Sequence, residues 1–364
     1  MKKLITIFTI TAMLVTALSA CGDSEVKNTV EQEKLSIVTT IFPEYDWVLN
    51  VLGENPAGAE VTMLLDNGVD LHSYQPTAED IVKMSNCDML VYVGGESDEW
   101  VDDVLENAEN ENLVAINLLN VLGDSAKEEE VIEGMQGGDH DHEHEGDADH
   151  DHEGDSDHDH DGDTDHDEHD EDMEHDGHDH EHGEEAELDE HVWLSLKNAS
   201  KLVAKISEEL QTLDPVNAET YAKNAAAYIE KINELDTKYE TVVAAAPSKS
   251  LLFGDRFPFR YMVDDYGIDY YAAFVGCSSE TEASIDTIMF LANKVDELSL
   301  NSVMTIEGAK HKIAETIVKN TKEKKQKILT LDSMQSTMSK DVDAGVSYLS
   351  VMEGNLSVLK EALK

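Results

Sequence analysis

The sequence predicts an α/β fold of two lobes, each with a mostly parallel sheet, joined by one long helix. Three observations support this prediction. Short apolar, β-branched runs alternate with helical stretches in residues 35–119 and again in residues 250–362. One amphipathic stretch of about thirty residues separates the two halves. The chain of 364 residues is also too long for one ordinary core and suits two.

The first half contains four predicted strands, at residues 35–42, 59–65, 88–95 and 113–119. Helical spacing appears between them at residues 43–53 and 76–86, and each of these segments starts with a proline, which is favoured at the first turn of a helix. Such β/α units form a parallel sheet, and ligands bind at the carboxyl ends of its strands. We therefore look for functional residues just after the strands.

The second half begins with a predicted helix at residues 194–210, followed by a longer helix from Asp214-Pro215 to about Ala246. Apolar side chains recur along the longer helix at steps of three and four residues, which predicts one buried stripe: Tyr221, Ala225, Tyr228, Ile232, Leu235 and Tyr239. Four further strands are predicted at 250–257, 268–276, 300–308 and 327–334, with helices around 282–297, 309–323 and 343–362.

The N-terminus has the layout of a secretory signal peptide in residues 1–20, with two lysines before an apolar run. Leu18-Ser19-Ala20-Cys21 resembles the lipobox of bacterial lipoproteins, which implies lipid attachment at Cys21 and a tether over residues 21–34. No later apolar run approaches the roughly 20 residues of a membrane-spanning helix. We expect an extracytoplasmic protein that is lipid-anchored to the cell membrane.

The chain is strongly acidic, with 79 Asp and Glu against 26 Lys and Arg and a net charge of −53. Nucleic acids and anionic lipid surfaces would repel such a protein, so neither is an expected partner. Cations are the natural ligands. The two cysteines of the body, Cys87 and Cys277, lie in or beside apolar segments of different halves, and we expect two buried free thiols rather than a disulfide.

Residues 139–182 form a His-rich tract with thirteen histidines, twenty-three acidic residues and no Lys or Arg. With almost no apolar side chains the tract should be disordered. Neutral imidazoles beside carboxylates can still bind zinc weakly and in many arrangements, so we expect an accessory collector of metal ions, or else a merely solubilising insertion. Its histidines are His140, His142, His144, His150, His152, His158, His160, His166, His169, His175, His178, His180 and His182.

Three histidines lie outside the tract. His72 follows the second predicted strand, and His191 immediately precedes the helix that leads away from the first lobe. Two histidines at the same edge of one sheet favour a metal site in the crevice, because neutral imidazole is the commonest zinc ligand. His311 lies beside lysines on a predicted helix, where we expect a surface position.

Three motifs carry a resemblance to a known family. HSYQPTAED at residues 72–80, DEHVWLSLKNA at 189–199 and YLSVMEGNL at 348–356 are similar to segments of the solute-binding lipoproteins of zinc and manganese ABC importers. The resemblance implies two β/α lobes with the metal in the cleft between them, joined by a single backbone helix. It also implies that His72 and His191 are the first two ligands, and that an acidic His-rich insertion stands just before the second.

The second lobe departs from the family pattern. Where the family has a ligand, alignment places Gly254 or Arg256, neither of which can bind a metal; Asp255 is the nearest side chain that could, and Glu282 is an alternative. Asp332 matches the family's final aspartate ligand. The expected site therefore has two imidazoles and one or two carboxylates, a set that suits Zn²⁺ and also Mn²⁺, and the tract favours zinc.

The resemblance implies a monomeric, non-enzymatic receptor that captures Zn²⁺, or less favourably Mn²⁺, and delivers it to an ABC permease with a separate ATPase subunit. A metal-buffering or adhesin-type lipoprotein of the same fold is the alternative. A secreted zinc hydrolase is a weaker alternative, since the sequence contains no H-E-x-x-H zinc-protease motif. The first predicted lobe spans residues 35–194 and includes an acidic linker at 124–187. A helical connector covers residues 195–246, and the second predicted lobe spans residues 247–364.

Overall fold

The computed structural model describes residues 34–136, 187–278, 282–308 and 310–364, of which residues from 35 onward group as one unit. The predicted signal peptide, Cys21, nearly all of the tether and the whole His-rich tract lie outside the described residues. Among the residues described, we find no helix both long and apolar enough to cross a bilayer.

The first sheet has four parallel strands in the order β2-β1-β3-β4. Its strands confirm all four predictions: β1 (Ser36–Thr39), β2 (Glu60–Met63), β3 (Met89–Tyr92) and β4 (Val114–Asn117). The helices of this half are α2 (Phe42–Leu52), α3 (Ala78–Asn86), α4 (Trp100–Glu106) and α5 (Leu118–Leu122). Thr77 fixes the start of α3, because its hydroxyl accepts from the N–H of Asp80 while the carboxylate of Asp80 accepts in return.

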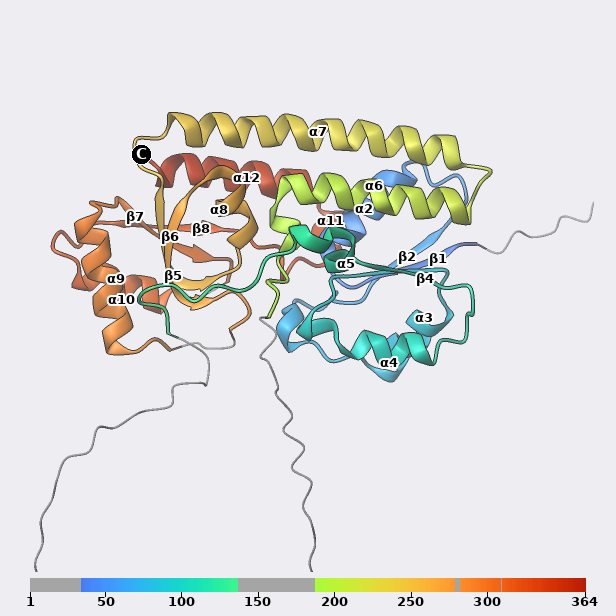
Figure 1. The fold of residues 1–364 in the computed structure, drawn as a ribbon, viewed down its shortest axis with the longest axis horizontal. Coiled ribbons are helices and arrows are strands. Elements are labelled where there is room, and N and C mark those ends of the chain that lie inside the picture. Colours follow the sequence, from blue (N-terminus) through green and yellow to red (C-terminus); the bar gives the residue numbers. More distant parts are fainter. Residues whose placement is uncertain (1–33, 137–186, 279–281, 309) are drawn as a thin grey trace, which may run out of the picture. The chain divides into compact units, whose positions relative to one another are not determined.

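The second sheet is also parallel, in the order β6-β5-β7-β8, and it confirms the other four predicted strands (Figure 1). Its elements are β5 (Ser250–Phe257), α8 (Arg260–Tyr266), β6 (Asp269–Val275), α9 (Ile285–Glu297), β7 (Ser302–Ile306), α10 (Lys312–Asn320), β8 (Lys327–Leu331) and α11 (Ser339–Asp343). Gly254 in β5 has a packing role, since a Cβ there would lie 2.6 Å from the Cα of Ala314 in α10.

Three long helices connect the two halves: α6 (Leu196–Leu213), α7 (Ala218–Ala245) and α12 (Tyr348–Ala362). α7 has 28 residues and starts four residues after the predicted Asp214. All six members of its predicted stripe are buried. α7 contacts α2 and α6 of the first half and α8 and α12 of the second half. Buried hydrogen bonds fix it there: Tyr228 donates to Asp46 in α2 (2.7 Å), and Tyr239 donates to the carbonyl of Met352 in α12 (2.6 Å).

Four short 3₁₀ helices complete the described elements: η1 (Leu71–Ser73), η2 (Glu96–Asp98), η3 (Gly123–Ser125) and η4 (Val192–Leu194). Residues 126–136, which we call the strap, follow η3. The strap was predicted as part of a linker of the first lobe, but the structure places it against the second: Gln136 N–H donates to the carbonyl of Ala273 in β6 (2.9 Å), and Arg260 in α8 pairs with Glu130 (3.2 Å).

Candidate metal site

His72 is held in η1, in the loop that follows the carboxyl end of β2. Asp70 caps this turn, because its Oδ1 accepts from the N–H of His72 (3.1 Å). The ring Nδ1 of His72 lies 2.7 Å from the hydroxyl of Ser97 and 3.3 Å from Oε2 of Glu190. Burial opposes ionisation of Glu190, but bonds from His72 and Ser97 outweigh it and hold the pKa of this carboxyl below its usual value.

His191 is fully buried and directly precedes η4. Asp189 fixes it twice, since its Oδ1 accepts from the backbone N–H of His191 (2.9 Å) and lies 3.1 Å from the ring Nδ1. The next turn is secured to the second half of the chain by Trp193, whose indole N–H donates to the carbonyl of Ser333 (2.8 Å). The ring of His191 is therefore held in one orientation from its own loop and from the loop after β8.

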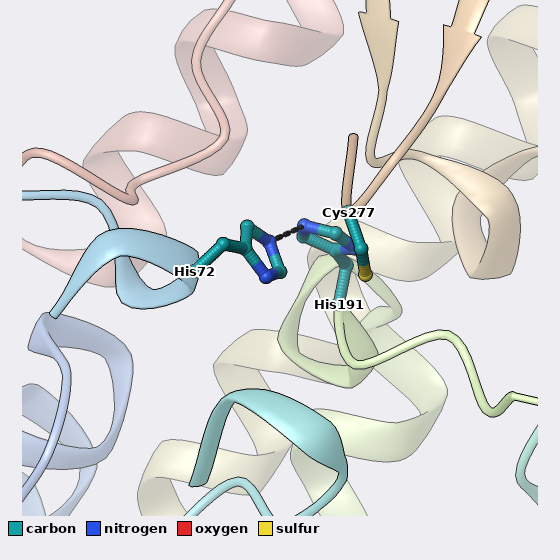
Figure 2. A group of neighbouring side chains, drawn as sticks. All are labelled: His72, His191 and Cys277. Carbon is teal, nitrogen blue, oxygen red and sulfur yellow. Dashed lines mark hydrogen bonds between the residues drawn. The ribbon is translucent and has the colours of Figure 1, made fainter. Parts of the chain in front are cut away.

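The two imidazoles face each other through Nε2, and these two atoms are 3.2 Å apart (Figure 2). Oδ1 of Asp189 can only accept from Nδ1 of His191, so Asp189 favours the tautomer of that ring with its proton on Nδ1. Nε2 of His191 then carries a lone pair and lies at hydrogen-bond distance from Nε2 of His72. Two nitrogen ligands of one tetrahedral zinc ion, at bonds of about 2.0–2.1 Å, would be separated by about 3.3 Å. The pair has the spacing of two ligands of one ion.

Gln335 contributes a group that the sequence did not reveal. Its amide nitrogen lies 2.5 Å from Nε2 of His191 and 3.5 Å from Nε2 of His72. Glu307, at the end of β7, fixes this loop by accepting from the backbone N–H of Gln335 (3.2 Å) and from Ser333. The amide N–H of Gln335 thus lies where it can donate a hydrogen bond to the Nε2 atoms of the two histidines.

Arg256, one of the two residues aligned with a family ligand, forms an ion pair instead. Its guanidinium lies 2.6 Å from Oδ2 of Asp70 and 3.3 Å from Oε1 of Gln335. Burial opposes ionisation of Asp70, but the guanidinium of Arg256 and the nearby His72 keep the pKa of this carboxyl low. Arg256 therefore brings a fixed positive charge to the edge of the histidine pair and ties the two sheets together there.

The predicted carboxylate ligands are placed elsewhere. Asp255 directs Oδ1 to the N–H of Arg256 (3.0 Å) and Oδ2 toward the N–H of Ile306 (3.4 Å). Oδ1 of Asp332 accepts from the N–H of Met334 (2.8 Å). Burial raises the pKa of both carboxyls. Glu282 is exposed, and His311, expected at the surface, is half-buried beside Asp255. Among the described residues, Asp255, Glu282 and Asp332 are not in the group of ligand atoms that lie within 4.8 Å of one another, so their role as ligands stays a prediction.

Cys277 joins the two histidines instead. Within the described ranges, the one group of three His, Cys, Asp or Glu side chains with ligand atoms all inside 4.8 Å of one another is His72, His191 and Cys277 (Figure 2). Both described cysteines are free, as predicted; Cys87 is buried, whereas Cys277 is only partly buried. Burial raises the pKa of the Cys277 thiol, and Glu129 and Asp189 raise it further, so the metal-free group is a neutral thiol.

The model of one protein family, the zinc-uptake complex component A periplasmic family (ZnuA), matches residues 37–362. The chain belongs to this family. The match runs through both sheets and all the site residues described above, and it begins within β1. The fold predicted from the sequence is therefore that of the ZnuA family.

Relatives agree with this assignment. The chain is 31% identical over 330 residues to the zinc-binding lipoprotein AdcA of Streptococcus pneumoniae (strain ATCC BAA-255 / R6), covering 90% of this chain but 56% of that protein, so it spans about half the length of that relative. It is 28% identical over 364 residues to the high-affinity zinc uptake system protein ZnuA of Bacillus subtilis (strain 168), covering 100% and 98%. The crystal structure of the Zn(II)-bound ZnuA-like domain of S. pneumoniae AdcA has a TM-score of 0.63 and 28% identity, covering 91% of this chain and 99% of that one.

Proposed function

We propose that this chain is the extracytoplasmic receptor of a metal ABC importer, which captures Zn²⁺ between its lobes and delivers it to a membrane permease with a separate ATPase. The observation that carries the proposal is the histidine pair. Two imidazoles present Nε2 to the same point at the spacing of co-ligands. Nδ1 of His191 is fixed by the buried carboxylate of Asp189, and Nδ1 of His72 lies 2.7 Å from the hydroxyl of Ser97 and 3.3 Å from the buried carboxylate of Glu190. Carboxylate-to-histidine bonds of this kind are the usual support of a metal-ligating imidazole.

The charge around the pair suits a divalent cation. Asp70, Asp189 and Glu190 all lie within 4 Å of a histidine nitrogen, whereas Arg256 is the nearby cation and is already paired with Asp70. Asp189 and Glu190 are bound to the imidazoles rather than free to act as general bases. This arrangement favours binding over catalysis, so we propose a non-enzymatic receptor that binds as a monomer.

The names of the relatives support zinc as the cargo, with Mn²⁺ as the competitor to be tested. Lipid attachment at Cys21 is part of the proposal, as is metal collection by the His-rich tract. Described residues on both sides of the tract meet near the site, since Glu129 N–H donates to the carbonyl of Glu187 (2.8 Å) and His191 follows four residues later.

Metal titration of the full chain and of a variant lacking residues 139–182 tests the proposal. We expect the shortened protein to bind one Zn²⁺ tightly and Mn²⁺ far more weakly, and we expect the full chain to bind additional, weaker Zn²⁺ ions. His72→Ala and His191→Ala should each abolish the tight site in both backgrounds. If tight binding instead disappears when the tract is deleted and survives both alanine substitutions, the protein is a metal buffer. Circular dichroism checks that the variants are folded.

A further inference from the structure

The second lobe offers one side chain of metal-binding chemistry to the histidine pair, and it is a cysteine. Cys277 lies two residues beyond the carboxyl end of β6, as His72 lies in the loop after β2. Its sulfur belongs to the same group as the two histidines, within 4.8 Å. Figure 2 shows the sulfur beside the ring of His191. Both sheets therefore present a ligand at their carboxyl edges, where binding sites of parallel sheets form.

Neighbouring residues hold Cys277 at this place. Its backbone N–H donates to Oε1 of Glu129 in the strap (3.0 Å). The preceding Gly276 lets the chain pass directly against the imidazole, because a Cβ there would lie 3.0 Å from Cε1 of His191 and 3.0 Å from the carbonyl oxygen of Phe257. A larger residue would be tightly packed at this close approach, and the contact sets the next residue alongside the ring.

The other second-lobe candidates have polar partners of their own. Arg256 is bound to Asp70 and Gln335, and both oxygens of Asp255 and Oδ1 of Asp332 accept from backbone N–H groups. The facing Nε2 atoms of His72 and His191, which have the spacing of two ligands of one ion, independently indicate a cation at this point. A third ligand from the second lobe is required if the ion is to be held between the lobes, and Cys277 is the described side chain with the proximity and chemistry for that role.

We propose that the sulfur of Cys277 is the third protein ligand of the Zn²⁺ held by His72 and His191, and that this sulfur selects Zn²⁺ over Mn²⁺. The inference rests on the proposed function of the histidine pair. On binding, the S–H bond of Cys277 breaks, a Zn–S bond forms, and the proton passes to solvent, with no change in oxidation state. Thiolate is a soft ligand that suits zinc, whereas manganese prefers oxygen.

The movement required is small. With a Zn–S bond of about 2.3 Å and Zn–N bonds of about 2.0–2.1 Å, the sulfur of a tetrahedral site would lie about 3.5 Å from each Nε2. The ligand atoms of the group are already within 4.8 Å of one another. A small adjustment of these side chains completes a site of two nitrogens and one sulfur, with a fourth position open.

Cobalt substitution of the full chain tests this ligand directly. The tract contains no cysteine, so a thiolate-to-cobalt charge-transfer band in the near ultraviolet reports only on Cys21, Cys87 and Cys277. In a Cys21→Ser background we expect one equivalent of Co²⁺ to produce the band. Cys277→Ser should remove the band and weaken Zn²⁺ binding about 100-fold, with a much smaller effect on Mn²⁺. The matched control, Cys87→Ser, should keep both the band and the affinity.

A measurement without a site variant guards against misfolding of Cys277→Ser. In the Cys21→Ser protein, one equivalent of Zn²⁺ should protect Cys277 from alkylation, as mapped by mass spectrometry, and binding should release one proton more than does binding to Cys277→Ser. Tight Zn²⁺ binding that depends on His72 but gives neither a cobalt–thiolate band nor protection would overturn the role of Cys277 and leave the proposed function intact. Loss of the histidine dependence itself would overturn the proposed function.

Discussion

Nε2 of His72 and Nε2 of His191 lie 3.2 Å apart although the residues are 119 positions apart in the chain. Nδ1 of His191 is fixed by the carboxylate of Asp189 and Nδ1 of His72 by the hydroxyl of Ser97, so both Nε2 atoms are directed at one point. The amide nitrogen of Gln335 lies at that point, 2.5 Å from Nε2 of His191 and 3.5 Å from Nε2 of His72. Binding of an ion therefore has to displace one specific side-chain contact.

The support of His191 by Asp189 can be tested with Asp189→Asn. The amide keeps an oxygen for the backbone N–H of His191 but removes the charge that holds the ring proton on Nδ1. We expect Zn²⁺ affinity to fall about 10- to 100-fold with little change in folding. Competition with a fluorescent chelator measures this change. Asp269→Asn, at an exposed position, is the matched control, and equal effects of both substitutions would argue against a role for Asp189.

Arg256→Gln tests the effect of the guanidinium. The substitution removes a positive charge beside the proposed site and frees Asp70 from its ion pair. Because charge repulsion between Arg256 and a divalent cation is relieved, we expect Zn²⁺ affinity to rise about tenfold. Calorimetric titration gives the constants. Arg260→Gln, which removes a cation paired with Glu130, should leave the affinity unchanged. Weaker binding by Arg256→Gln would mean that its bond to Gln335 matters more than its charge.

The hydrogen bond between Tyr228 and Asp46 should contribute to stability. It is buried, 2.7 Å long and joins α7 to α2. Tyr228→Phe leaves a buried carboxyl without its phenolic donor, and we expect a loss of about 1–3 kcal/mol in the free energy of unfolding. Urea denaturation in the presence of a chelator measures it. Tyr271→Phe, at a ring packed on Phe290, is the control, and a loss of the same size there would contradict the assignment.

Asp98 should make stability fall as pH rises. Burial raises the pKa of this carboxyl to about 7, although the N–H groups of Val93 and Gly94 donate to its Oδ2. Because the folded-state pKa of Asp98 lies above the unfolded value, its contribution to the free energy of unfolding is complete below about pH 4. That contribution is lost as the pH increases through about 7. The full effect is at most about 4 kcal/mol.

Asp98→Asn isolates this contribution from the general acidity of the chain. An asparagine can direct its oxygen to the same two N–H groups without ionising. Chelator-treated wild-type protein should lose more unfolding free energy between pH 4 and pH 8 than does the variant, as followed by denaturant melts at each pH. Parallel curves for the two proteins would show that Asp98 does not titrate in this range.

The fold was predictable because its signals are local. All eight strands lie inside the predicted segments, since alternation of short β-branched runs with helices needs no tertiary information. The stripe from Tyr221 to Tyr239 was readable from periodicity alone. The ends of elements differed, as at the start of α7, where Asp214 accepts bonds from Asn217 and Tyr221 before the helix begins. The short helices α4, α5 and α8 were not predicted.

The site was predictable only in part. His72 and His191 stood out because each borders a strand or helix of the first lobe. Other contacts depend on how the two lobes meet: Arg256 pairs with Asp70, which is 186 positions away, and Gln335 contacts His191. No sequence spacing encodes that packing. The signal that could have revealed Cys277 was present: it follows the end of β6 directly, and the rule that drew attention to His72 applies equally to the second sheet.

The contacts of α7 with helices of both halves have a mechanical consequence. A rod of 28 residues that is bonded to α2 through Tyr228 and to α12 through Tyr239 resists bending, so the halves cannot swing apart without breaking buried contacts. Every side chain placed around the histidine pair, by contrast, lies in a loop, in a short 3₁₀ turn or at the end of a strand. We therefore expect these short segments to move when an ion binds or leaves, while the helices and sheets keep their positions. The radius of gyration should be the same in the metal-free and the metal-bound protein.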